Sequence, residues 1–184
     1  MTLIENIFKL IVRFMISAIS TCLLPSLYLI KSRYELIDIP MWINYAIYIG
    51  SPLILGLVML QWFKIQPNDS ITYDIQRLTP VNNEYLPIYL GYIFVALSIP
   101  NPCDGKIDLI SLLVVYIMIC LFVTGSKSLS FNPIFIIYGY GYYKIKTKSN
   151  IEVFIISKRK FNKHTEHITF PHLKKVNEFV YFEG

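Results

Sequence analysis

Long apolar segments separated by short polar ones make up the first two thirds of the chain. A helix needs about 20 apolar residues to cross the hydrocarbon core of a bilayer. Four segments come near that length, the third being the shortest: residues 7–30, 42–63, 85–100 and 108–125. Trp42 and Trp62 stand at the two ends of the second segment, a placement typical of membrane interfaces. The pattern predicts four transmembrane helices.

The pattern changes after residue 140. Lys144, Lys146 and Lys148 alternate with isoleucine and threonine, which is the two-residue period of a β-strand. A polar turn at 148–150 and the β-branched run 151–157 then predict a β-hairpin. The preceding run, 131–140, is apolar but too short to cross a bilayer, so we expect it at the membrane interface.

The composition favours an integral membrane protein. Hydrophobic residues make up 54% of the chain, charged residues only 16%, and the mean hydropathy is +0.50. Soluble domains contain about 25% charged residues. The N-terminal segment lacks a short apolar core followed by a small-residue cleavage site, so we interpret it as a retained first span.

The positive charge lies at the C-terminal end. Nine of the 17 Lys and Arg residues, against four Glu, fall from Lys144 onward, so this part carries the whole net charge of +5. The positive-inside rule places it in the cytoplasm. With four spans the N-terminus is cytoplasmic too. The predicted fold class is an all-α transmembrane four-helix bundle (residues 1–127) with a small cytosolic β-containing C-terminal tail (residues 128–184).

Two groups of residues are candidates for a functional role. The basic group has three interpretations: contact with anionic lipid headgroups, docking of an acidic cytosolic partner, and, less favoured, nucleic-acid binding. Its members are Lys144, Lys146, Lys148, Lys158, Arg159 and Lys160. The second group would allow close helix packing or a kink in a span. It comprises Ala46, Gly50, Pro52 and Pro87.

The sequence offers no catalytic constellation. It contains no nucleophile elbow, HExxH, P-loop or dinucleotide fingerprint, so we expect neither an enzyme nor a cofactor. No ionisable residue falls in the middle of a span, which argues against an ion-coupled carrier. Asp108 stands at the start of the last span, where a carboxylate suits the helix dipole.

Two local patterns have simpler explanations. Gly139-Tyr140-Gly141 resembles part of a potassium-channel filter, but a basic tail follows where a closing span would be needed. An interfacial turn with aromatic anchors explains it better. The histidines His164, His167 and His172 lack a cysteine or a fourth ligand nearby, so we expect surface histidines and no metal site.

Two stretches resemble a known family. They read EYLPIYLGYIFVALSIPN (residues 84–101) and FNPIFIIYGYGYYKIKT followed by FIISKRK (residues 131–160). These stretches are similar to the small bacterial membrane proteins of the KwaA family, the membrane component of the Kiwa anti-phage system. The resemblance covers mainly the second half of the chain. It implies a role in sensing phage infection at the bacterial inner membrane. It also implies a homo-oligomer, suspected to be a tetramer, whose cytosolic face engages a soluble DNA-binding partner of the KwaB type.

The leading hypothesis is therefore a membrane sensor and scaffold that recruits a cytosolic effector. A small oligomeric pore that depolarises the membrane is the alternative, and an accessory subunit of a transporter is a third. A sensor of the first kind needs a bundle with two packings whose balance responds to bilayer stress. Pro25, Pro52 and Pro87 are the candidate soft points.

Overall fold

The computed structural model describes most of the chain and divides into two compact units. The described residues are 3–69, 75–100, 108–125, 131–147, 152–161, 170, 173–177 and 179–184. The first unit, here called the helical unit, comprises Met1–Gly56 and Ile88–Asn132. The second, here called the sheet unit, comprises Leu57–Pro87 and Pro133–Gly184. Two helices, α3 (Met41–Ile65) and α4 (Asn82–Ser98), contribute residues to both units.

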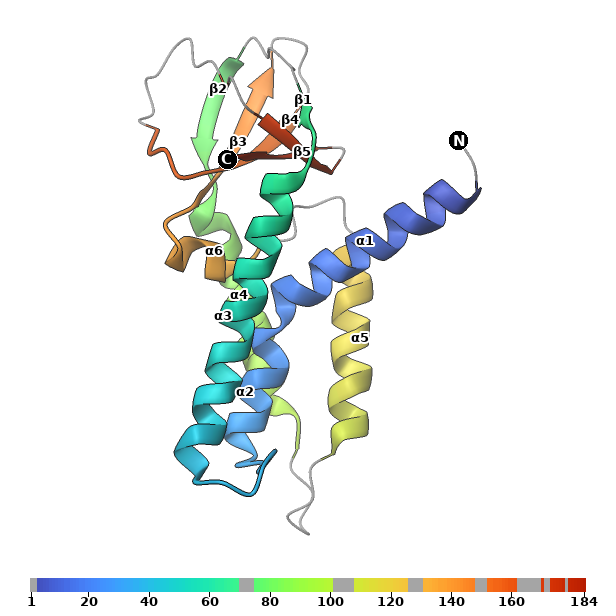
Figure 1. Cartoon of the computed structure of the whole chain (residues 1–184), viewed down its shortest axis with the longest axis vertical. Helices are drawn as coiled ribbons and strands as arrows, with labels where there is room; N and C mark the ends of the chain where they lie inside the picture. Colours follow the sequence, from blue (N-terminus) through green and yellow to red (C-terminus); the bar gives the residue numbers. More distant parts are fainter. Residues whose placement is uncertain are drawn as a thin grey trace. The chain divides into compact units, whose positions relative to one another are not determined.

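The helical unit begins with a broken helix (Figure 1). Helix α1 (Leu3–Thr21) ends one residue before α2 (Leu23–Lys31), and the two meet at an angle. Pro25 explains the break, because proline has no N–H for the carbonyl of Thr21 and its ring clashes with that carbonyl. Lys31 then joins α2 to the end of α4, since its Nζ donates to the carbonyls of Leu97 (2.6 Å) and Ile99 (2.8 Å).

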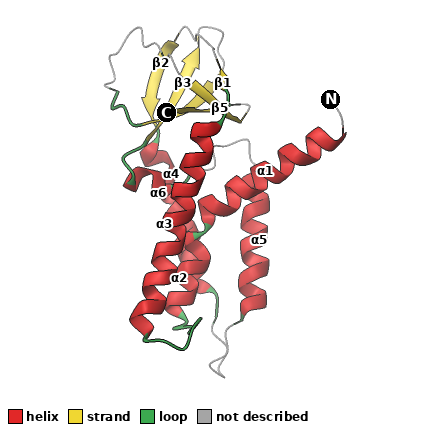
Figure 2. Cartoon of the chain, in the orientation of Figure 1, coloured by secondary structure: helices red, strands yellow, loops and turns green. Residues whose placement is uncertain are grey.

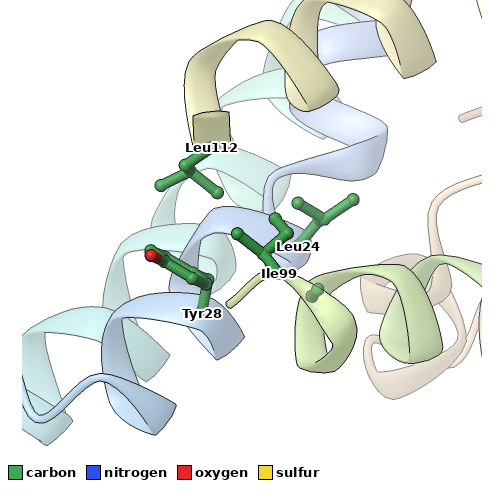
Figure 3. Packing of buried hydrophobic residues seen from close by; sticks show 5 residues of the cluster. Leu24, Tyr28, Ile99 and Leu112 are labelled. Carbon is green, nitrogen blue, oxygen red and sulfur yellow. The ribbon is translucent and has the colours of Figure 1, made fainter. Parts of the chain in front are cut away.

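A small apolar core holds the helical unit together (Figure 3). It consists of Leu24, Tyr28, Ala96, Ile99 and Leu112, which come from α2, the end of α4 and α5 (Leu109–Gly125).

Polar contacts join α1 to α5. The Tyr116 hydroxyl donates to the Ala18 carbonyl at 2.7 Å, and Thr21 Oγ1 lies 3.5 Å from Cys120 Sγ. Asp108 caps α5 by accepting the Ser111 N–H at 2.8 Å, and the Ser111 hydroxyl and N–H together lower the pKa of Asp108. Its place at the start of this helix agrees with the prediction from the sequence.

Two helices are long and apolar enough to cross a membrane, counting only the described residues. They are Lys9–Lys31, which covers most of α1 and all of α2, and Met41–Ile65, which is α3. Helix α5 is also apolar but has only 17 residues, and α4 has 17 as well.

The sheet unit contains a six-stranded sheet (Figure 2). Its strands are β1 (Asn68–Asp69), β2 (Ile75–Pro80), β3 (Gly141–Thr147), β4 (Glu152–Ser157), β5 (Leu173–Asn177) and β6 (Val180–Glu183). Their order is β1-β5-β6-β4-β3-β2. Strands β4 and β6 are parallel, and the other neighbours are antiparallel. The short helix α6 (Pro133–Ile137) precedes β3.

Both faces of the sheet bury apolar side chains. One face carries a cluster of Ile145, Val153, Ile155, Leu173 and Tyr181, with Leu78 and Phe170 packed against it. The opposite face carries Tyr142, Ile156 and Phe182, all at most 2% exposed. These buried side chains make the sheet the core of this unit.

The expected fold class, an all-α four-helix bundle with a small tail, is wrong. The chain forms a mixed sheet whose members come from two distant regions, because β2 lies in the polar segment after α3 and the other long strands lie beyond residue 140. Pro67 and Pro80 are typical of turns, but strand β2 lies in this segment and ends at Pro80. Only two helices among the described residues reach spanning length, since α4 and α5 are each three residues short of about 20.

Candidate functional site

The lysines of β3 lie on the same face of the sheet, two residues apart. Lys144 Nζ forms an ion pair with Glu152 Oε2 at 2.8 Å, and the two side chains are 35% and 50% exposed. Lys146 stands opposite Glu152 on β4 and opposite Arg77 on β2. Lys148 falls outside the described residues. The described part of β3 therefore presents two lysines beside a single exposed carboxylate.

A network of hydrogen bonds fixes the chain just after β4. Arg159 Nε lies 3.0 Å from Oε1 of Glu183, a carboxylate that is 8% exposed. The Ser157 hydroxyl donates to Oε2 of the same carboxylate and accepts the Arg159 N–H at 2.9 Å. From β3, the Tyr143 hydroxyl donates to the Arg159 carbonyl at 2.9 Å. Arg159, expected as a contact residue, thus has its charge paired within the chain.

Glu183 and Ser157 are not identifiable from the sequence. No motif surrounds either residue, and their proximity depends on the parallel pairing of β4 with β6. A serine hydroxyl beside a carboxylate can suggest catalysis, but Ser157 is completely buried and no substrate can reach it. We interpret the pair as an internal anchor of the last strand.

Lys158 and Lys160 flank Arg159 and are exposed. Lys158 Nζ lies 5.0 Å from the centroid of the Tyr140 ring, within the range of a cation–π contact. Tyr140 is 6% exposed, and burial raises the pKa of its hydroxyl. Neither lysine forms an ion pair with a carboxylate in the described part of the chain.

A group of aromatic rings connects this region to the end of α3. We call it the aromatic cluster, and it consists of Phe63, Phe135, Tyr140, Tyr142 and Phe182. Phe63 is 1% exposed, with its ring centroid 5.8 Å from that of Phe135 and 5.7 Å from that of Phe182. Tyr140 in turn lies 5.4 Å from Phe182, and Phe135 stacks on Tyr142 at 6.4 Å. Phe63 thus attaches the end of α3 to the sheet unit.

Hydrogen bonds join the end of α3 and the start of α4 to strands of the sheet. Lys174 on β5 donates to the Lys64 carbonyl, one of the carbonyls that have no partner within α3. At the beginning of α4, Asn82 Oδ1 accepts the Tyr142 N–H at 2.8 Å. The preceding residue, Val81, donates its N–H to the Tyr142 carbonyl at 3.0 Å. The strand that carries Lys144 is therefore bonded directly to the start of α4.

The four residues predicted to allow close packing or a kink, Ala46, Gly50, Pro52 and Pro87, lie in different surroundings. Ala46 is exposed, and a Cβ added to Gly50 would meet no atom within 4 Å, so this small-residue pair contacts no other helix in the described part of the chain. Pro52 lies inside α3, and the Ser51 hydroxyl donates at 3.4 Å to Tyr48, whose carbonyl Pro52 cannot bond. Pro87 lies inside α4 and is the last residue of its segment in the sheet unit.

The three histidines lie outside the described residues, so the structure does not test the expectation for them. Elsewhere, no three residues among His, Cys, Asp and Glu gather in a way that could hold a metal ion, as far as the described chain shows.

Comparison with known proteins identifies the family. No curated protein and no solved structure matches the chain. The family model described as anti-phage protein KwaA matches residues 12–182 of the 184, which include α2 to α6 and nearly all of the sheet. The chain therefore belongs to the KwaA family of anti-phage proteins.

Proposed function

We propose that this anti-phage protein is a multi-pass scaffold in the bacterial inner membrane. It responds to infection in the bilayer and holds a cytosolic DNA-binding effector on the lysines of β3. One observation carries the proposal: α3, which is long enough to span a membrane, ends inside a folded sheet unit that presents Lys144 and Lys146. A membrane helix whose end belongs to a charged folded unit is what a membrane scaffold requires.

The surfaces of the helices support membrane insertion. Only 39% and 33% of the two candidate spans is buried within the chain, whereas the core helix of a soluble protein is mostly covered. Large apolar side chains remain exposed along the helices, for example Ile54 (62%), Phe94 (67%), Ile110 (76%) and Phe122 (70%). Lipid is the medium that would cover them.

The contacts of α3 and α4 support a sensing role. Both helices reach the sheet unit at the aromatic cluster, one through Phe63 and the other through Asn82. A change in bilayer thickness or tension alters the tilt of spanning helices. A shift of α3 would act through Phe63 and Phe135 on Tyr142, two residues before Lys144, and would change how the β3 lysines are presented.

The proposal includes a homo-oligomer. Ala46 and Gly50 are one helical turn apart and open to their surroundings, so a helix of a second copy can approach α3 closely there. Light scattering of the purified protein would measure its mass, and the mass of a monomer would contradict this part of the proposal.

Capture of the effector tests the proposal. The full-length protein would be purified from gently solubilised membranes of cells that express it with its neighbouring genes, and soluble proteins bound to it would be identified. We expect the wild type to retain a DNA-binding protein and the variant K144E/K146E to lose it, because reversed charges repel an acidic surface. The matched control is K158E/K160E, which reverses the same number of charges elsewhere on the sheet unit.

Two results would contradict the proposal. Retention of the effector by K144E/K146E at the wild-type level would show that the β3 lysines do not hold it. If the wild type retains no soluble protein and instead depolarises cells when expressed alone, the chain is a pore.

A further inference from the structure

Lys146 and Lys158 lie at opposite ends of the β3–β4 pair, and Lys144 lies between them. Gly141 at the start of β3 is opposite Ser157 at the end of β4, so Lys158 follows directly at this end. Lys146 is opposite Glu152 at the other end. Strands rise about 3.3 Å per residue, which separates Lys146 from Gly141 by about 17 Å along β3. Lys146 is therefore well separated along the strand from the end at which Lys158 lies.

The Lys158 end is the one that adjoins the end of α3. Lys158 lies over the ring of Tyr140 at 5.0 Å, Tyr140 contacts Phe182 at 5.4 Å, and Phe182 contacts Phe63 at 5.7 Å. Next to Phe63, the half-buried Trp62 ring lies 5.7 Å from it in the last turns of α3. Tryptophan and tyrosine at the end of a spanning helix are typical of the headgroup region.

The hydrogen bonds and ion pair of Arg159 hold the backbone between two exposed lysines. The Arg159 N–H, carbonyl and side chain are all engaged by Ser157, Tyr143 and Glu183, so the backbone between the lysines is fixed. The guanidinium charge is paired with Glu183. Lys158 and Lys160 have no carboxylate partner among the described residues and remain exposed on either side.

We infer that Lys158 and Lys160 bind the phosphate groups of anionic phospholipids at the cytosolic surface of the membrane, whereas Lys144 and Lys146 are left for the effector. This inference rests on the membrane placement of the proposed function. Lipid is favoured over an acidic protein because Lys158 lies over Tyr140, a ring of the aromatic cluster that also contains Phe63 of α3. Near the end of a spanning helix, each basic side chain gains attraction from the anionic leaflet.

Lipid retention on the full-length protein tests the inference. The detergent-solubilised protein would be exposed to a mixture of phosphatidylglycerol and phosphatidylcholine, and native mass spectrometry would measure which lipid it keeps. We expect the wild type to prefer phosphatidylglycerol and K158Q/K160Q to lose about tenfold to thirtyfold of that preference. The matched control K144Q/K146Q should keep it. Thermal unfolding of each variant verifies that the sheet unit is intact.

Three outcomes would overturn the inference. K158Q/K160Q could retain phosphatidylglycerol as the wild type does, or K144Q/K146Q could lose it to the same extent. Alternatively, K158Q/K160Q could keep its lipid preference and lose the effector, which would assign these lysines to a protein partner. Effector capture is measured on the same samples. It distinguishes failure of the lipid inference from failure of the proposed scaffold, because a wild type that shows no lipid preference can still bind its effector.

Discussion

Glu183 connects the last strand, β6, to the end of β4. Its carboxylate is 8% exposed and contacts both Arg159 and Ser157, which lie in or just after a different strand. A buried carboxylate is stable only when it is paired and hydrogen-bonded. Because Arg159 is 54% exposed, water weakens the ion pair, and the hydrogen bond to Ser157 carries a large share of the stabilisation.

Replacing Glu183 by glutamine should loosen β6. The amide keeps the shape but removes the charge that pairs with Arg159, so we expect a loss of about 1–3 kcal/mol in the free energy of unfolding. Thermal unfolding of the solubilised protein would measure it as a lower midpoint. The control Glu152→Gln breaks the exposed pair with Lys144 and should cost less than about 1 kcal/mol. Equal midpoints for the two variants would contradict a special role for Glu183.

The basic residues show what sequence alone can and cannot say at this scale. Their clustering after residue 140 shows that the positive charge lies in the C-terminal region, and their role in binding stays a prediction. The pairing of Arg159 depends on Glu183, which is 24 positions further along the chain and lies beside it because β4 pairs with β6. No local pattern encodes that contact.

Phe63 is the side chain that attaches the end of α3 to the sheet unit. It is 1% exposed between Phe135 of α6 and Phe182 of β6. Ile65, two residues further along the same helix, is 80% exposed. Truncation of Phe63 therefore removes buried ring contacts, whereas truncation of Ile65 removes a side chain that is mostly exposed.

Truncation of Phe63 to alanine should destabilise the sheet unit by about 3 kcal/mol or more, because it leaves a cavity among packed rings. The control Ile65→Ala, at an exposed position of the same helical turn, should leave the unit almost unchanged. Limited proteolysis of the solubilised protein would follow the effect through faster cleavage of the strands. A Phe63→Ala protein as resistant as Ile65→Ala would show that the aromatic cluster does not hold the helix end.

Element prediction succeeded where the periodicity was local. Alternation of lysine with apolar residues predicts β3, and the next β-branched run predicts its antiparallel neighbour β4. It failed for β2, whose six residues end at Pro80 and lie in a segment rich in turn residues. Proline is tolerated there because β2 is an edge strand, and this position becomes apparent only once the sheet is assembled.

At the scale of the molecule, the sheet unit includes the last turns of α3 and the first turn of α4. The division into two units falls inside α3 and α4, near Pro52 in one and at Pro87 in the other. Composition predicts the apolar helices, but not that residues from both sides of α4 and α5 would form one sheet. Such pairing is nonlocal, so it leaves little trace in any window of sequence.

In the proposed arrangement the helices lie in the bilayer and the sheet unit faces the cytosol, where an effector can reach it. Cysteine accessibility tests it most directly. In a variant whose three native cysteines are replaced by serine, Lys160→Cys would be exposed to a membrane-impermeant maleimide in intact cells and after lysis. We expect labelling only after lysis, with the protein retained in the membrane fraction after carbonate extraction. Labelling in intact cells, or release by carbonate, would contradict it.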